Sequence, residues 1–215
     1  MKKTLFCLSL ALLSTGLFAQ AALEKAIAPK LEKLAQAKQS EEFTALANDF
    51  LRIAEKEKTQ WLPYYYTALA HLNNGRKQLI EKKTDNLDAI SDEADKYIAL
   101  ADGLSPNNSE IYILKKMSSH ARMMVNPMLR FRSHGKTADE ALNKAKELNP
   151  NNPRALMLDG QDFYYKPALF GGSKDKAKVL FDKADEQFKA AKPETAISPN
   201  WGQAENDYML GLYKK

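Results

Sequence analysis

The chain of 215 residues offers little that could support catalysis or metal binding. Its histidines, His71, His120 and His134, are not spaced to place two imidazoles on one turn of a helix, and no second ligand recurs beside them. The sequence contains no Gly-x-Ser-x-Gly nucleophile elbow. We therefore predict that the protein is not an enzyme and that it holds neither a metal ion nor a cofactor.

Two further features resemble ligand sites but have structural explanations. The acidic run consists of Asp85, Asp88, Asp92, Glu93 and Asp95. It lacks the central glycine and the alternating spacing of a calcium loop, and acids near a helix start are favourable with the helix dipole. Gly171-Gly172 lacks the Gly-Lys-Ser/Thr of a phosphate loop and is expected to form a turn with positive φ before a helix. The alternative is an anion bound at the start of that helix.

Arginines are better suited to recognition. Four of them invite an anion-binding hypothesis: Arg122, Arg130, Arg132 and Arg154. A guanidinium group can pair with a carboxylate through two parallel hydrogen bonds. The alternative is a structural role, in which these side chains satisfy carbonyl groups left free by helix breaks at Pro127 and Gly135.

Internal repeats predict the elements that position these residues. Ala94, Ile98, Ala101 and Pro106 recur 44 residues later as Ala138, Leu142, Ala145 and Pro150, and a third copy is Ala177, Phe181 and Ala184. Spacings of four and three residues fall on one helix face, where small residues allow a neighbouring helix to approach closely. No segment shows the sustained alternation of a strand. We predict an all-α fold in which Ala145 and Ala184 lie at close helix–helix contacts.

The pattern Ala177-x3-Phe181-x2-Ala184 resembles the second helix of the tetratricopeptide (TPR) family, and Leu156, Gly160 and Phe163 resemble its first helix. Segments such as residues 149–154 are similar to exported TPR-like proteins of Gram-negative bacteria, a family without an assigned activity. The resemblance implies a TPR-like α-solenoid of stacked antiparallel helical hairpins with inter-helix insertions. Lys116 departs from the pattern, because it stands where the family has a small residue.

The same resemblance implies a concave groove lined by residues next to the packing positions. The predicted partner-binding residues are Tyr65, His120, Arg122, Arg154, Gln161 and Tyr164. We expect Tyr65, Arg154 and Tyr164 to share one concave surface. The alternative for the tyrosines is that they pack between helices and keep only a wet hydroxyl group.

Two segments interrupt the repeat, at residues 126–135 and 166–173. The first contains Met128, Leu129 and Phe131. Leaving apolar surface in water costs about 25 cal/mol per Å². We therefore predict that residues 126–135 fold back and pack on the helices.

The amino terminus predicts export. Lys2 and Lys3 precede an apolar run, and Ala19-Gln20-Ala21 is a small-residue cleavage pattern. We predict a signal peptide over residues 1–21, cut after Ala19 or Ala21, and one helical repeat domain over residues 22–215. The remaining sequence has no cysteine, and it predicts no stable membrane insertion. Its net charge falls from +5 to about +3 once the two lysines are removed, which does not favour nucleic acid as a partner.

These observations predict a periplasmic interaction scaffold that binds a peptide or a partner protein in its concave groove. Secretion beyond the periplasm is also possible. The alternative function is a small-molecule binding accessory protein, in which the insertions close one end of the groove and Tyr and Arg side chains orient an anionic solute.

Overall fold

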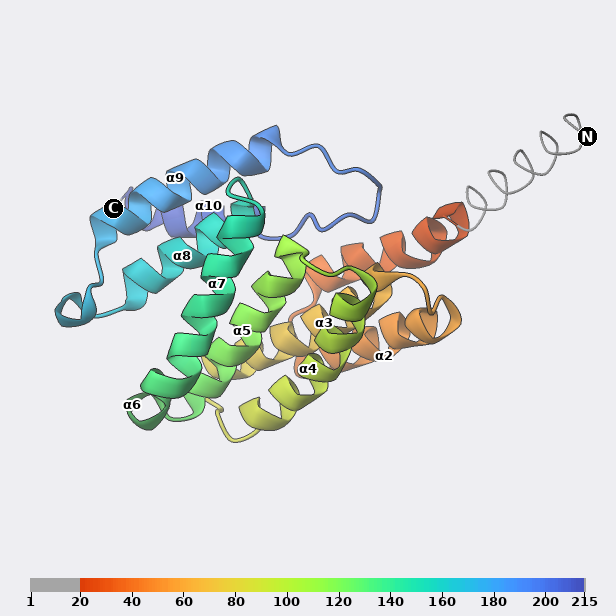
Figure 1. Ribbon diagram of the computed structural model, residues 1–215, viewed down its shortest axis with the longest axis horizontal. Helices are drawn as coiled ribbons and strands as arrows, with labels where there is room; N and C mark the ends of the chain where they lie inside the picture. Colours follow the sequence, from red (N-terminus) through yellow and green to blue (C-terminus); the bar gives the residue numbers. More distant parts are fainter. Residues whose placement is uncertain (1–19, 215) are drawn as a thin grey trace, which may run out of the picture.

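The protein is all-α in the computed structural model, which describes residues 20–214 (Figure 1). The predicted signal peptide lies almost entirely outside the described residues. A first helix covers residues 20–36. The helices that follow are α2 (Ser40–Lys56), α3 (Trp61–Ile80), α4 (Leu87–Leu104), α5 (Ser109–Val125), α6 (Pro127–Arg130), η1 (Phe131–Gly135), α7 (Lys136–Leu148), α8 (Pro153–Tyr165), η2 (Ala168–Phe170), α9 (Lys174–Ala190) and α10 (Gln203–Gly211).

Short polar residues set where several helices begin. The Asn108 side chain accepts a hydrogen bond from the backbone N–H of Glu110 at the start of α5. Asn152 accepts from two backbone N–H groups of α8, and Pro153 occupies the first turn, where its missing N–H is not needed. Ser173 caps α9 in the same way. Local sequence therefore fixes these helix starts.

The repeat residues form the contacts between helices, as predicted. Ala145 and Ala184 are both fully buried. Gly160 on α8 shows how close the approach is, because a Cβ atom there would lie 2.6 Å from the Phe181 ring of α9. Gly160 of α8 thus leaves room for the Phe181 ring of α9, and this contact packs α8 tightly against α9.

Consecutive helices pack side by side in chain order. The α3 helix contacts both α2 and α4, α5 contacts α3, α4 and α7, and α9 contacts α8 and α10. The segment between α9 and α10 departs from this order and runs back across the molecule towards the first helices (Figure 1). The Tyr66 hydroxyl of α3 donates to the Ile197 carbonyl over 2.8 Å, and Ile197 is fully buried. This segment therefore ties the last helices to α3.

Lys116 occupies the repeat position that should be small. Its side chain is buried, and its ammonium group lies 2.8 Å from the Asp162 carboxylate of α8. A lysine is much longer than alanine, so α5 and α8 are joined here by an ion pair between side chains. Lys116, which departs from the repeat pattern, therefore connects α5 to α8 through a salt bridge.

The prediction that the apolar side chains of residues 126–135 pack on the helices is wrong. The segment is helical, but Met128, Leu129 and Phe131 are 95%, 79% and 46% exposed. Polar contacts hold the segment instead, because Arg130 donates to both oxygens of Asp88 over 2.6 and 2.9 Å and to the Arg122 carbonyl over 3.0 Å. These hydrogen bonds also lower the pKa of Asp88. Hydrogen bonds from Arg130 to α4 and α5, and not packing of its apolar side chains, therefore hold the segment in place.

Candidate functional site

A buried polar network joins α3, α5, α8 and the segment before α10. Arg154 donates from Nε and Nη2 to the Glu110 carboxylate at 2.6–3.0 Å. The Tyr65 hydroxyl donates to Oε2 of Glu110 over 3.1 Å and accepts from the Trp201 indole N–H over 2.8 Å. Asn152 also donates to Glu110, over 2.7 Å. Side chains from α3 and α8 therefore meet at the Glu110 carboxylate of α5, and Trp201 joins the network through Tyr65 and Arg154.

This network corrects the predicted roles of Tyr65 and Arg154. The two residues are brought together, as predicted, but Tyr65 is fully buried and Arg154 nearly so. Burial, followed by the charge of Glu110, raises the pKa of the Tyr65 hydroxyl well above its ordinary value. The carboxylate that Arg154 clamps belongs to the protein itself. The Tyr65 ring therefore packs between helices, as in the alternative, but its hydroxyl group is buried and hydrogen-bonded to the protein, and neither side chain lines an open groove.

A second polar cluster lies between α3, α8 and α10. Gln161 donates to the Glu205 carboxylate over 2.6 Å, and Arg76 of α3 forms an ion pair with the same group. The predicted site residue His120 of α5 lies within electrostatic range of the Arg76 guanidinium group. Gln161 of α8 and Arg76 of α3 are thus joined through Glu205 of α10.

His120 is neutral in this environment. Burial of the imidazole, reinforced by the positive charge of Lys116, lowers the pKa of His120 from 6.5 to about 4. The other histidines lie elsewhere: His71 stacks on Tyr97 with ring centroids 5.8 Å apart, and His134 lies near Asp88. Within residues 20–214, no group of three or more His, Cys, Asp or Glu side chains is arranged to hold a metal ion.

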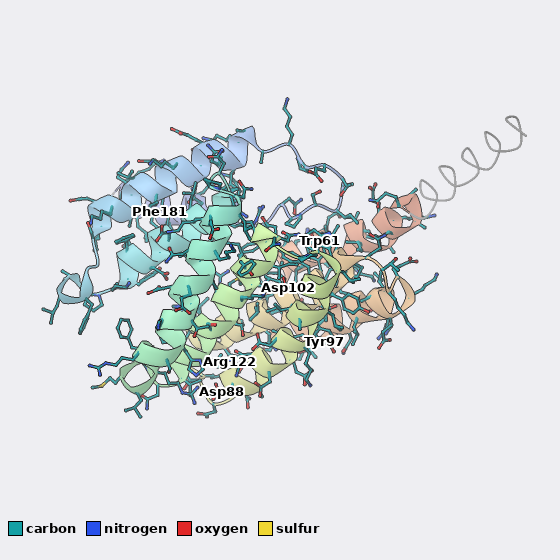
Figure 2. The ribbon with its side chains drawn as sticks, in the orientation of Figure 1. Trp61, Asp88, Tyr97, Asp102, Arg122 and Phe181 are labelled. Atoms are coloured by element: carbon teal, nitrogen blue, oxygen red, sulfur yellow. The ribbon has the colours of Figure 1, made fainter. Side chains whose placement is uncertain are left out.

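Arg122 and Tyr164 are not part of either cluster. Arg122 pairs with Asp92 and Asp95 of α4 at 2.8 and 2.6 Å, and it lies near Asp88 at the end of the molecule that carries α6 (Figure 2). Tyr164 packs its ring against Tyr165 and Tyr213. The prediction that Tyr164 shares an open surface with Tyr65 and Arg154 is therefore wrong, because Tyr65 and Arg154 are buried in the Glu110 network while the Tyr164 ring packs on Tyr165 and Tyr213.

Several exposed apolar side chains lie in the two insertions, which approach each other in space. Phe131 of η1 and Phe170 of η2 have ring centroids 6.3 Å apart, and Phe170 is 63% exposed. Phe131 rests on Gly135, where a Cβ atom would lie 3.3 Å from its ring. The insertion patch consists of Met128, Leu129, Phe131, Tyr165, Leu169 and Phe170, all of them exposed. The apolar content of both insertions was visible in the sequence, but their contact was not.

The insertion patch continues towards α10. Tyr165 ends α8, and its hydroxyl donates to the sulfur of Met209 over 3.6 Å. Tyr208 of α10 is exposed and lies close enough to Tyr165 to influence its pKa, which burial raises first and Tyr208 second. Exposed aromatic side chains therefore lie at the end of α8 and on α10 as well as in the insertions.

One further depression, of about 340 Å³, lies between α7 and α8. Its lining is mixed: Leu142 and Phe163 contribute apolar surface, and Asp159 and Asp162 pair with Lys146 and Lys116 at 2.7 and 2.8 Å. Its acids are thus largely satisfied by neighbouring lysines. In the part of the chain that the structure describes, no helix has the length and apolar character needed to cross a membrane.

Comparison with known proteins finds one informative relative. No family model and no curated protein matches the chain. The solved structure of the HusA haemophore from Porphyromonas gingivalis is similar, with a TM-score of 0.79 and 34% sequence identity. The alignment covers 88% of this chain and 92% of HusA. At this identity and coverage, the chain belongs to the same family as HusA.

Proposed function

We propose that this protein binds haem, or a porphyrin closely related to it, on the insertion patch. The observation that carries the proposal is the exposed contact between Phe131 and Phe170, which the two insertions create together. Soluble proteins rarely leave a contiguous apolar surface exposed without a use for it. Two aromatic rings at the edge of such a surface suit a flat, largely apolar macrocycle.

The similarity to HusA supports the choice of ligand. HusA is named a haemophore, so its function is to bind haem. The region aligned with HusA spans most of this chain. Transfer of that ligand to this chain remains our proposal, and the exposed aromatic side chains give it a physical location.

The proposal favours the small-molecule alternative over the protein scaffold. The scaffold hypothesis relied on Tyr65 and Arg154, whose side chains are already engaged inside the protein. Haem carries two carboxylates, so it agrees with the expected anionic solute. We further propose that the pairs α3/α4, α5/α7 and α8/α9 form a TPR-like stack, that the protein is exported to the periplasm or beyond, and that it has no catalytic role.

Haem titration tests the proposal. The wild-type protein is expected to shift and sharpen the Soret band of ferric haem in a saturable manner. Phe131→Ala and Phe170→Ala should each weaken binding by about tenfold, because loss of one aromatic contact removes roughly 0.5–1.5 kcal/mol plus buried area. Matched controls are Leu100→Ala on α4 and Val179→Ala on α9, which remove exposed apolar side chains outside the insertion patch.

Two results would contradict the proposal. A wild-type protein that gives no saturable spectral change does not bind haem. Equal affinities for the wild type and the two phenylalanine variants would show that haem binds elsewhere. Circular dichroism of each variant checks that the helical fold is retained.

A further inference from the structure

Basic residues accompany the apolar residues of both insertions. Residues 126–138 contain Arg130, Arg132 and Lys136 but no acid, and residues 163–174 contain Lys166 and Lys174 but no acid. The chain as a whole has 32 basic and 27 acidic residues, so two neighbouring segments without acids depart from its general composition. The insertion patch is therefore bordered by positive charge.

Three of these five cations are engaged. Arg130 is held by Asp88, Lys136 lies 3.7 Å from Glu140, and Lys174 lies over the Tyr164 ring, 5.2 Å from its centroid. Each of these contacts fixes or partly neutralises the charge. The remaining two cations are Arg132 in the first insertion and Lys166 in the second.

Arg132 and Lys166 form no salt bridge with any residue between 20 and 214. Arg132 is exposed and directly follows Phe131. Lys166 directly follows Tyr165 and also lines the depression between α7 and α8, whose Asp162 already pairs with Lys116. Each insertion thus carries one free cation close in sequence to its phenylalanine: Arg132 is next to Phe131, and Lys166 is four residues before Phe170.

The backbone around Lys166 is tightly constrained. A Cβ atom on Gly172 would lie 1.7 Å from the Lys166 carbonyl oxygen, and the Ser173 N–H donates to the Phe163 carbonyl over 2.9 Å. The η2 segment is therefore closed onto the end of α8. This closure keeps Lys166 at the base of the loop that carries Phe170.

We propose that Arg132 and Lys166 bind the two carboxylates of a porphyrin whose face lies on the insertion patch, so that the site selects porphyrin dicarboxylates over neutral porphyrins. This inference rests on the proposed function and adds ligand specificity to it. Guanidinium and ammonium groups that lack internal partners can form charge-assisted hydrogen bonds with a ligand at little cost in lost contacts. Apolar contacts provide affinity, and the two cations orient the ring.

The test compares ferric haem with its dimethyl ester, in which both carboxylates are neutral. Soret titrations at low and high salt should show that the wild type prefers haem and that salt reduces this preference. Arg132→Gln together with Lys166→Gln should weaken haem binding by roughly tenfold and leave ester binding unchanged. The matched control, Lys33→Gln with Lys38→Gln, removes the same charge from two exposed lysines near the first helix and should leave both affinities unchanged.

Each other outcome overturns a defined part of the proposal. If the wild type binds neither ligand, the proposed function fails and this inference fails with it. If the wild type binds both ligands equally, or the Arg132 and Lys166 variant weakens both equally, the carboxylate assignment alone is wrong. If the control variant weakens haem binding as much, net charge and not these two residues governs affinity.

Discussion

Glu110 and Arg154 form a buried ion pair that joins α5 to α8, with the shortest nitrogen–oxygen distance at 2.6 Å. The same carboxylate accepts hydrogen bonds from Tyr65 and Asn152. Arg154 also places its guanidinium group 5.8 Å from the centre of the Trp201 ring. The pair therefore organises the contact between the middle and the end of the chain.

Removing one member of this pair should be strongly destabilising. Arg154→Met leaves a buried carboxylate without its main partner, at a cost of roughly 3–5 kcal/mol in the free energy of unfolding. Urea denaturation measures this change. Arg154→Met with Glu110→Leu should cost less than the sum of the single changes, because no charge stays unpaired. Additive effects in this cycle would show that the two side chains do not interact.

Gly160→Ala should destabilise the contact between α8 and α9. The new methyl group would lie 2.6 Å from the Phe181 ring, and such overpacking costs roughly 1–3 kcal/mol. The control is Gly103→Ala, where the added Cβ meets no atom within 4 Å and the better helix propensity of alanine should stabilise α4 by about 0.5–1 kcal/mol. A stabilised Gly160→Ala variant would contradict the described packing.

Ala145→Leu and Ala184→Leu should have the same effect at two other joints. Both alanines are fully buried on helix faces that meet other helices, so the added atoms should cost roughly 1–3 kcal/mol. The denaturation midpoint of each variant gives the measurement. Ala190→Leu, at an exposed position of α9, is the control. Unchanged midpoints for both buried positions would refute the repeat register.

Met128→Ser with Leu129→Ser should leave stability almost unchanged. Both side chains are exposed on α6, and substitutions at such positions usually change the free energy of unfolding by less than about 0.5 kcal/mol. Thermal unfolding followed by circular dichroism is sufficient to test this. A loss of several degrees in Tm would mean that these residues pack on the helices after all, as the sequence predicted.

His120 should make stability depend on pH. Its pKa is about 4 in the folded protein and 6.5 in the unfolded chain, so between these values the unfolded chain binds more protons. Stability is therefore lost as pH falls from 6.5 to about 4, by up to roughly 3 kcal/mol from this group, and does not change further below that range. His120→Gln should flatten this part of the curve. Equal slopes for the wild type and His120→Gln would contradict the assignment.

The sequence by itself determined the helical fold and much of its packing. The alanines around Leu142 and Phe181, together with Gly160, mark where helices meet, because close approach requires small residues at regular helical spacing. Asn108 and Asn152 mark helix starts for an equally local reason, since their side chains satisfy N–H groups two or three residues away. Helix starts and the small residues at helix contacts can therefore be predicted from a few consecutive residues.

Only the tertiary structure decided which residues are available to a ligand. Tyr65 and Arg154 have suitable side chains for recognition, but whether they face solvent depends on Glu110 and on Trp201, which lies 136 residues after Tyr65. Phe131 and Phe170 likewise become neighbours only when two insertions from different helix pairs meet. Such exposure and such contacts depend on how separate helices are oriented, and the spacing of residues along one helix does not specify this orientation. The buried network around Glu110 and the insertion patch could therefore be recognised only in the folded structure.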